Sequence, residues 1–373
     1  MLHVDIPTRS EIAALNGTRS DACVSIYLPT TPLTQETGAT RIEFGNLVRQ
    51  AREQLEAAGF DKRRLAALQE QIDALAEDDE FWRLQANSLA LLATPESLRT
   101  FRLANHLTAL VEVSDRFHLK PLLRALTFPQ SAYVLALSEN AVRLVEVHGE
   151  LPAATVRIEG LPKDAASAVG KSTLNDRSAS GRIQGSEGQN VRFQQYARKV
   201  DAALRPFLAG RETPLILAAT GRLASVFRTV NSYPHLLPDD ISDSPDRISD
   251  ADLAAAARPV LDAAHARDLA ALTALYAARA GEGRATADVS DAARAATYGA
   301  IDTLLVDIDT VVAGTVDEES GAVTFAEAAS AGTYGIVDEI AGRALASGAR
   351  VLGVRRADLP GKGDLAAILR FAV

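Results

Sequence analysis

The chain has 373 residues and a formal net charge of −9, with 47% hydrophobic and 23% charged residues. This composition is ordinary for a globular protein, and the length predicts two or three domains rather than a single core. The acidic balance argues against nonspecific binding of nucleic acid over the whole surface.

The sequence has one cysteine, Cys23, which excludes an internal disulfide and a cysteine-rich metal site. A single thiol is typical of a reducing compartment, so we expect a cytoplasmic protein. Residues 1–7 lack the basic and long apolar segments of a signal peptide. No apolar run approaches the roughly 20 residues that a membrane helix needs, so we expect no membrane association.

The first segment, residues 1–126, has the pattern of a mixed α/β domain. A β-rich run over 23–28 predicts a strand that Pro29 closes. Apolar residues at helical spacing predict helices over 42–57 and 63–75. Three more strands are predicted, over 88–93, 98–103 and 107–113.

The second segment, residues 127–247, opens with a predicted hairpin. Strands over 133–137 and 142–147 flank a turn that ends at Asn140, a residue that tolerates the left-handed conformation. A third strand is predicted at 155–158. The next 28 residues, 163–190, contain few large apolar side chains and predict a long loop.

A helix is predicted directly behind this loop, over 190–205, with Pro206 ending it. Its buried stripe consists of apolar residues at helical spacing: Phe193, Tyr196, Ala197, Val200 and Leu204. A buried strand over 215–219 and a helix over 221–230 follow.

The third segment, residues 248–373, alternates between helices and strands. The acidic, turn-rich stretch 238–252 predicts a linker that ends in a helix cap at Ser249 or Asp250. Helices are predicted over 251–280, with Pro259 as a candidate interruption, and over 289–297 and 335–347. Strands are predicted over 303–306, 310–313, 350–354 and 367–371. Such alternation predicts an α/β/α sandwich.

Several catalytic motifs can be set aside. The run Gly170-Lys171-Ser172-Thr173 ends like a phosphate-binding loop, but Ala165 stands where that loop needs its first glycine. No pair of histidines has the spacing of a zinc hydrolase, and no G-x-S-x-G elbow is present. We therefore expect neither a metal nor a cofactor.

The stretch Gly185-Ser186-Glu187-Gly188-Gln189 is the strongest candidate for a site. The segment from Lys163 to Arg205 contains eight basic and four acidic residues, which gives a local excess of four positive charges in an acidic chain. Glycines permit a thin tip, and a glutamine amide can orient a water molecule without carrying a charge. A solvated polar loop with no function would explain the same composition.

Together with its neighbours, this stretch resembles a known family. The run from Gly185 to Leu208 is similar to the catalytic loop and supporting helix of archaeal and eukaryotic class-1 peptide chain release factors. The runs VSIYLPT at 24–30 and AARAATYGAIDTLLVD at 292–307 look like parts of the first and third domains of that family. The chain is therefore identified as a bacterial member of the archaeo-eukaryotic release factor superfamily, which includes Pelota.

The resemblance implies three mixed α/β domains, the last one similar to the kink-turn-binding ribosomal protein fold. It implies that Gln189 and Gly188 form a hydrolytic tip and that Gly185 and Glu187 shape the loop. It assigns RNA contacts to four basic residues: Arg182, Arg192, Arg198 and Lys199. The implied partners are the ribosome, through rRNA and peptidyl-tRNA, and a translational GTPase.

Two departures from the family pattern bear on activity. Glu187 stands where the family's Gly-Gly-Gln tip has its first glycine. The first segment contains no Asn-Ile-Lys-Ser motif for reading stop codons. Three functions follow as hypotheses: peptidyl-tRNA hydrolysis in termination or rescue of stalled ribosomes, ribosome or RNA binding without catalysis as in hibernation or protection, and a regulatory scaffold that has lost hydrolysis.

Overall fold

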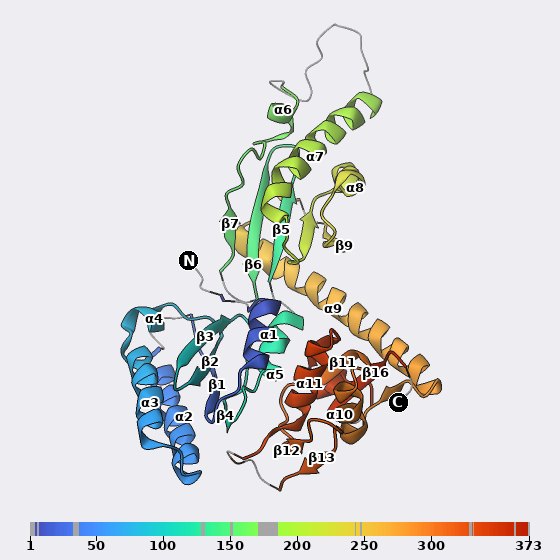
Figure 1. The fold of residues 1–373 in the computed structure, drawn as a ribbon. Helices are drawn as coiled ribbons and strands as arrows, with labels where there is room; N and C mark the ends of the chain where they lie inside the picture. The colour runs from blue at the N-terminus through green and yellow to red at the C-terminus, as the bar shows by residue number, and fades with distance from the viewer. Residues whose placement is uncertain are drawn as a thin grey trace. The chain divides into compact units, whose positions relative to one another are not determined.

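The computed structural model describes residues 4–5, 7–32, 37–127, 131–149, 152–170, 186–242, 244–246, 248–327, 330, 332–361 and 363–371. The chain forms two compact units, and Figure 1 colours it from end to end. Unit 1 combines Met1–Pro129 with Arg267–Val373, and unit 2 is Gln130–Ala266. The division into three domains at 126/127 and 247/248 stays a prediction.

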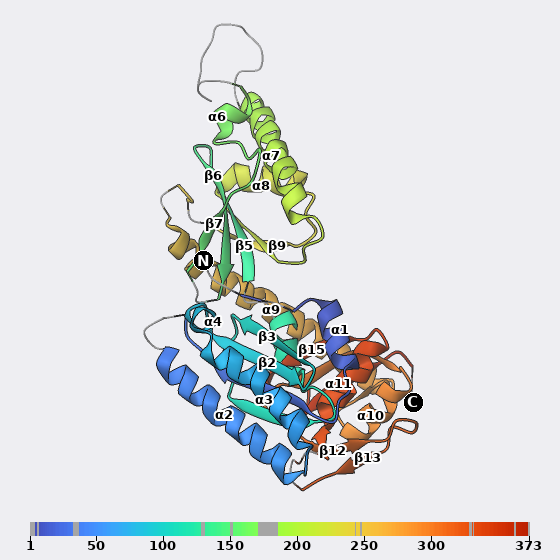
Figure 2. The same cartoon turned by 60° about the vertical axis from the view of Figure 1, so that its left-hand side comes forward.

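The N-terminal part of unit 1 is an antiparallel sheet with the strand order β3-β2-β1-β4. The strands are β1 (Cys23–Pro29), β2 (Ser88–Thr94), β3 (Ser97–Leu103) and β4 (Leu110–Ser114). The helices are α1 (Arg9–Gly17), α2 (Thr37–Ala57), α3 (Lys62–Glu77), α4 (Asp79–Arg83) and α5 (Lys120–Thr127). Side chains of α2 and α3 pack on one face of this sheet, and Figure 2 shows both helices along it.

The C-terminal part of unit 1 is built on a second sheet, with the order β10-β16-β11-β15. Its strands are β10 (Ala285–Thr286), β11 (Ile301–Asp307), β15 (Arg350–Val354) and β16 (Leu365–Leu369). A small sheet of order β13-β12-β14 consists of β12 (Ala313–Val316), β13 (Val323–Phe325) and β14 (Tyr334–Gly335). The helical elements are α10 (Val289–Thr297), α11 (Ile336–Ala346) and the 3-10 turn Arg356–Asp358.

Helices cover both faces of the sheet β10-β16-β11-β15. Leu304 and Val306 of β11 pack in the same core as α10 and α11. Leu305, between them in the sequence, points to the other face and packs in a core with Leu272 of α9 (Asp250–Gly281). This part is an α/β/α sandwich, as the sequence predicts. Its likeness to the kink-turn-binding ribosomal protein fold stays a prediction.

One hydrophobic core joins the two parts of unit 1. It contains Tyr27 and Leu92 from the first sheet, and Leu304, Val306 and Ile336 from the C-terminal part, all fully buried. The N- and C-terminal segments of the chain therefore share an interior, even though a continuous stretch of 137 residues, Gln130–Ala266, lies between them in the sequence.

Unit 2 is a mixed sheet with the order β7-β6-β5-β8-β9. Its strands are β5 (Ser131–Leu137), β6 (Val142–His148), β7 (Ala154–Val156), β8 (Leu215–Ala218) and β9 (Leu236–Ile241). Its helices are α6 (Ala165–Ala168), α7 (Ser186–Leu208) and α8 (Gly221–Val230), and α9 begins in it. The hairpin β5–β6 is confirmed, with Leu137 opposite Val142.

Strand β5 is buried along its whole length because helices cover both faces of this sheet. Leu135 and Leu217 pack with α7 and α8 on one face. Val134 and Ile216 pack with the first half of α9 on the other face. Figure 1 shows α7 and α9 on opposite sides of the sheet.

Three local predictions are wrong. The strand predicted over 310–313 lies later, as β12, because the hydroxyl of Thr310 bonds the Asp307 carboxylate and turns the chain after β11. Pro206 lies inside α7, which continues to Leu208 because that side chain is buried in the core. Pro259 likewise lies inside α9 without ending it.

Candidate functional site

The predicted tip lies at the start of α7 rather than in a loop. Helix α7 begins at Ser186, so Glu187, Gly188 and Gln189 belong to its first turn. The prediction of a loop up to residue 190 is therefore wrong for residues 186–190. Glutamate and glutamine are good helix formers. Arg182 and Gly185 lie outside the described residues.

Gln189 is exposed and lies in line with the buried stripe of α7. It precedes Phe193 by four residues and Tyr196 by seven, so all three side chains leave the helix on the same side. Phe193 is 4% exposed and Tyr196 is fully buried. Gln189 thus continues the stripe beyond the point where the core of unit 2 ends.

The turn between β5 and β6 holds the helices that carry this site. The hydroxyl of Tyr196 donates to the carbonyl oxygen of Ser138 at 3.0 Å, and burial raises the pKa of that hydroxyl above its usual range. The N–H of Ala165 in α6 donates to the carbonyl of Glu139 at 2.9 Å. The turn of the hairpin therefore anchors both α6 and α7 through two neighbouring backbone carbonyls, those of Ser138 and Glu139.

The basic residues predicted to contact RNA lie on two flanks of α7. Arg192 and Lys199 are seven residues apart and share one side of the helix. Arg198 lies on the other flank, seven residues (about two turns) before Arg205. Arg198 and Lys199 are exposed, and Arg192 is half-buried. The helix thus presents positive charge on both sides of its exposed surface, and no single row contains all these residues.

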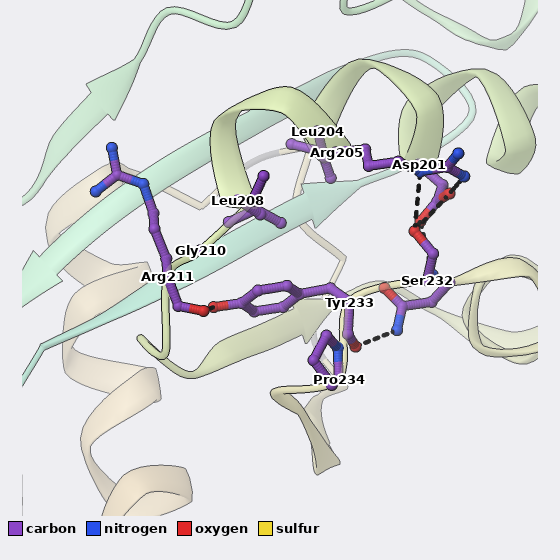
Figure 3. A pocket seen from close by; sticks show the side chains of 11 residues that line it. Asp201, Leu204, Arg205, Leu208, Gly210, Arg211, Ser232, Tyr233 and Pro234 are labelled. Carbon is purple, nitrogen blue, oxygen red and sulfur yellow. Dashed lines mark hydrogen bonds and ion pairs between the residues drawn. The ribbon is translucent and has the colours of Figure 1, made fainter.

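A pocket of about 160 Å³ lies at the other end of α7 (Figure 3). Asp201 at its edge is buried, and its carboxylate accepts from the N–H of Ser232 at 2.8 Å and from Arg205 at 2.8 Å. Tyr233 donates its hydroxyl to the carbonyl of Thr213 at 2.6 Å. These groups are paired within the protein, so we assign the pocket to holding the loop after α8 against α7.

Local sequence patterns give no sign of this pocket. In the sequence, Asp201 is one acidic residue in a charged helix. Its buried role depends on Ser232, which is 31 positions away, so spacing along one helix gives no signal for it.

The described part of the chain contains no group of three or more His, Cys, Asp or Glu side chains able to hold a metal ion. Among the same residues, no helix combines the length and the apolar character needed to span a membrane.

Comparison with known proteins finds a family match over unit 2. Residues 129–267 match the model of bacterial archaeo-eukaryotic release factor family 11. These bounds coincide with those of unit 2 to within one residue at each end. No curated protein matches the chain.

Several solved structures align with the chain at low identity. The archaeal translation termination factor aRF1 is 16% identical, with 98% of this chain and 99% of that chain covered and a TM-score of 0.23. Pelota of Archaeoglobus fulgidus is 17% identical, with 76% and 79% covered and a TM-score of 0.30. Dom34 of S. cerevisiae is 11% identical, with 74% and 73% covered and a TM-score of 0.42. The sequence match over unit 2 is the stronger finding, and it shows that residues 129–267 are similar to bacterial archaeo-eukaryotic release factor family 11.

Proposed function

We propose that the protein is a ribosome-associated translation factor and that unit 2 contains its functional site. The observation that carries the proposal is the position of Gln189. It lies exposed in the first turn of α7, inside the segment that matches the release factor family. Arg198 and Lys199 are exposed further along the same helix, where they can contact RNA phosphates.

The finer proposal is hydrolysis of peptidyl-tRNA. Water attacks the ester carbonyl carbon of the peptide, the bond from that carbon to the ribose oxygen breaks, and the ribose oxygen receives a proton. Gln189 would orient the water through its uncharged amide. A helix leaves its first four N–H groups without acceptors of its own, and the N–H of Gln189 is the fourth in α7. Such donors can stabilise the negative charge that develops on the carbonyl oxygen.

The test uses stalled ribosome–nascent chain complexes and measures released peptide. We expect the wild-type protein to free peptide and Gln189→Ala to lose at least a hundredfold of that rate, the usual effect of removing one oriented polar group. Gln195→Ala is the matched control, because Gln195 is also an exposed glutamine of α7 and should keep full activity. Equal release by the Gln189→Ala variant would refute the finer proposal.

A second candidate function is ribosome binding without hydrolysis. Two observations favour it: Gly188 and Gln189 are held in a helical turn rather than an extended tip, and Glu187 places an acidic residue where the tip would approach RNA. This function predicts salt-sensitive co-sedimentation with ribosomes and no released peptide. Absence of co-sedimentation at moderate salt would reject both functions and leave the regulatory scaffold. The translational GTPase partner, the contacts with rRNA and the cytoplasmic location stay predictions.

A further inference from the structure

A carboxylate from the C-terminal part of unit 1 caps a helix from the N-terminal part. One oxygen of Asp338 accepts from the N–H of Leu119 at 2.8 Å and from the N–H of Lys120 at 2.7 Å. Asp338 lies in the first turn of α11, and Lys120 begins α5. Side-chain acceptors at a helix start normally come from the residue just before the helix. Here the acceptor is more than 200 positions away.

The same helix start buries an ammonium group. Lys120 is fully buried, and its Nζ donates to the carbonyl of Asp307 at 2.8 Å and to the carbonyl of Thr310. Asp307 is the last residue of β11, and Thr310 follows that strand, so both acceptors belong to the C-terminal part. A buried charge is tolerated only when it is paired and hydrogen-bonded, so α5 can adopt this position only when β11 is in place.

The other end of α5 is held by β15. The hydroxyl oxygen of Thr127 accepts from the N–H of Gly353 at 2.9 Å, and Arg124 donates to the carbonyl of Gly353 at 3.3 Å. A Cβ on Gly353 would lie 2.9 Å from the backbone nitrogen of Arg124. The lack of a side chain at this strand position is therefore what lets the helix approach the edge of the sheet.

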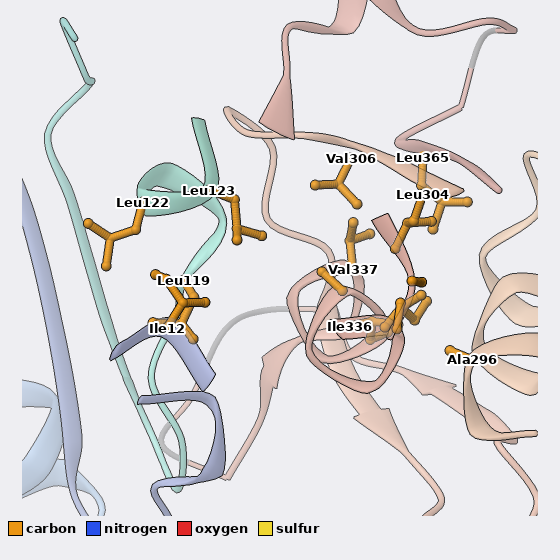
Figure 4. Packing of buried hydrophobic residues seen from close by; sticks show 14 of the residues in the cluster. Ile12, Leu119, Leu122, Leu123, Ala296, Leu304, Val306, Ile336, Val337 and Leu365 are labelled. Carbon is orange, nitrogen blue, oxygen red and sulfur yellow. The ribbon is translucent and has the colours of Figure 1, made fainter. Parts of the chain in front are cut away.

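Apolar packing joins the two ends. Leu119, Leu122 and Leu123 lie in one core with Val306 and Val337. Figure 4 shows Leu123 on the side of the helix toward Val306 and Val337, and Leu119 beside Ile12. Leu122 and Val306 are fully buried. Helix α5 thus belongs to the N-terminal segment by sequence and to the α/β/α sandwich by packing.

We propose that α5 clamps the N- and C-terminal segments into one cooperative folding unit, which unfolds as a whole and separately from unit 2. The clamp consists of Lys120, Arg124 and Thr127 on one side and Asp338 and Gly353 on the other. This inference concerns how the chain folds and does not depend on the proposed function.

The only tryptophan of the chain, Trp82, provides a selective probe. It is 1% exposed and packs against Phe44 and Phe81, on the face of the first sheet that α2 and α3 cover. Its fluorescence therefore reports the N-terminal segment, because the residues described in this core all come from that segment.

The experiment compares thermal unfolding of the full chain by tryptophan fluorescence and by far-UV circular dichroism. Asp338→Ala, which removes the acceptor of the N–H groups of Leu119 and Lys120, and Gly353→Ala both change the C-terminal segment alone. We expect each to lower the fluorescence midpoint of Trp82 by about 2–8 °C. Phe227→Ala, a matched control at a fully buried residue of unit 2, should leave that midpoint unchanged.

Two results would overturn the inference. A Trp82 midpoint that stays fixed while circular dichroism records a destabilised transition would mean that the C-terminal segment unfolds on its own. No shift in either signal, for both variants, would mean that the clamp contributes nothing to stability. Because Asp338→Ala removes atoms and adds none to the core, it also tests the clamp if Gly353→Ala does not fold.

Discussion

Replacing Lys120 by methionine tests how much the buried ammonium group contributes. Methionine keeps most of the side-chain length but removes the charge and all three donors. The carbonyls of Asp307 and Thr310 lose their hydrogen bonds to Nζ, and Asp338 loses a nearby positive charge. Each buried acceptor left unpaired costs about 1–3 kcal/mol. Depriving a buried charge of its compensating partner costs about 3–5 kcal/mol in all.

We therefore expect Lys120→Met to lower the free energy of unfolding of unit 1 by about 3–5 kcal/mol. A typical domain has about 5–15 kcal/mol, so the loss is large but leaves a folded protein. The assay is urea unfolding followed by the fluorescence of Trp82. Adding Asp338→Asn to Lys120→Met removes the stranded carboxylate, so the double variant should recover about 1–3 kcal/mol relative to the sum of the two single effects.

A cost of less than about 1 kcal/mol for Lys120→Met would show that the ammonium group makes no net contribution. Strict additivity of the two substitutions would show that Lys120 and Asp338 do not interact. Either result would refute the reasoning. The Lys120 ammonium group and the Asp338 carboxyl group are both buried, so bulk water cannot solvate one of them when the other is removed.

Three further outcomes are expected. Burial raises the pKa of Asp338 to about 7, so the unfolded chain releases this proton at a lower pH than the folded protein does. Wild-type stability, read from Trp82, should therefore fall relative to Asp338→Asn as the pH rises from about 4 to about 7, and parallel pH profiles would contradict this. Replacing Arg198 and Lys199 by glutamine should weaken ribosome co-sedimentation and reduce the slope of log affinity against log salt by about 1.4–1.8, whereas an unchanged slope would exclude contacts of these residues with phosphates. Tyr196→Phe removes one hydrogen bond and should cost about 1 kcal/mol, visible in circular dichroism as a shift of unit 2 without a change in tryptophan fluorescence.

Local patterns in the sequence predict most of the helices and strands. The alternation around Asn140 predicts β5 and β6, and the stripe from Phe193 to Leu204 predicts the body of α7. Helix α1 also carries a signal in the sequence. Thr8 and Glu11 form a capping box, in which each side chain bonds the other's backbone N–H.

The contacts between distant segments could not be predicted in this way. Helix α5 has only eight residues, and its cap comes from Asp338 rather than from a neighbour. The position of Gln189 depends on where α7 begins, and short-range propensities leave helix ends uncertain by a few residues. The predicted site residues from Glu187 to Lys199 are thus found on one helix, while the division of the basic ones between its two flanks emerges only from the fold.

The shared core of unit 1 has a consequence for synthesis on the ribosome. Helices α2 and α3 can cover one face of the first sheet as soon as the N-terminal segment has emerged. The other face shares its core with residues as late as Leu365 and Leu369. At about 5–20 residues per second, translation of the intervening chain takes on the order of ten seconds or more.

Unit 2 is continuous in sequence and can complete its own core during this interval. The order of folding would then differ from the order of the chain, with the middle finished before the beginning. Until the last strand is made, the nascent protein exposes an apolar sheet face around Tyr27 and Leu92, which is the surface that a chaperone would recognise.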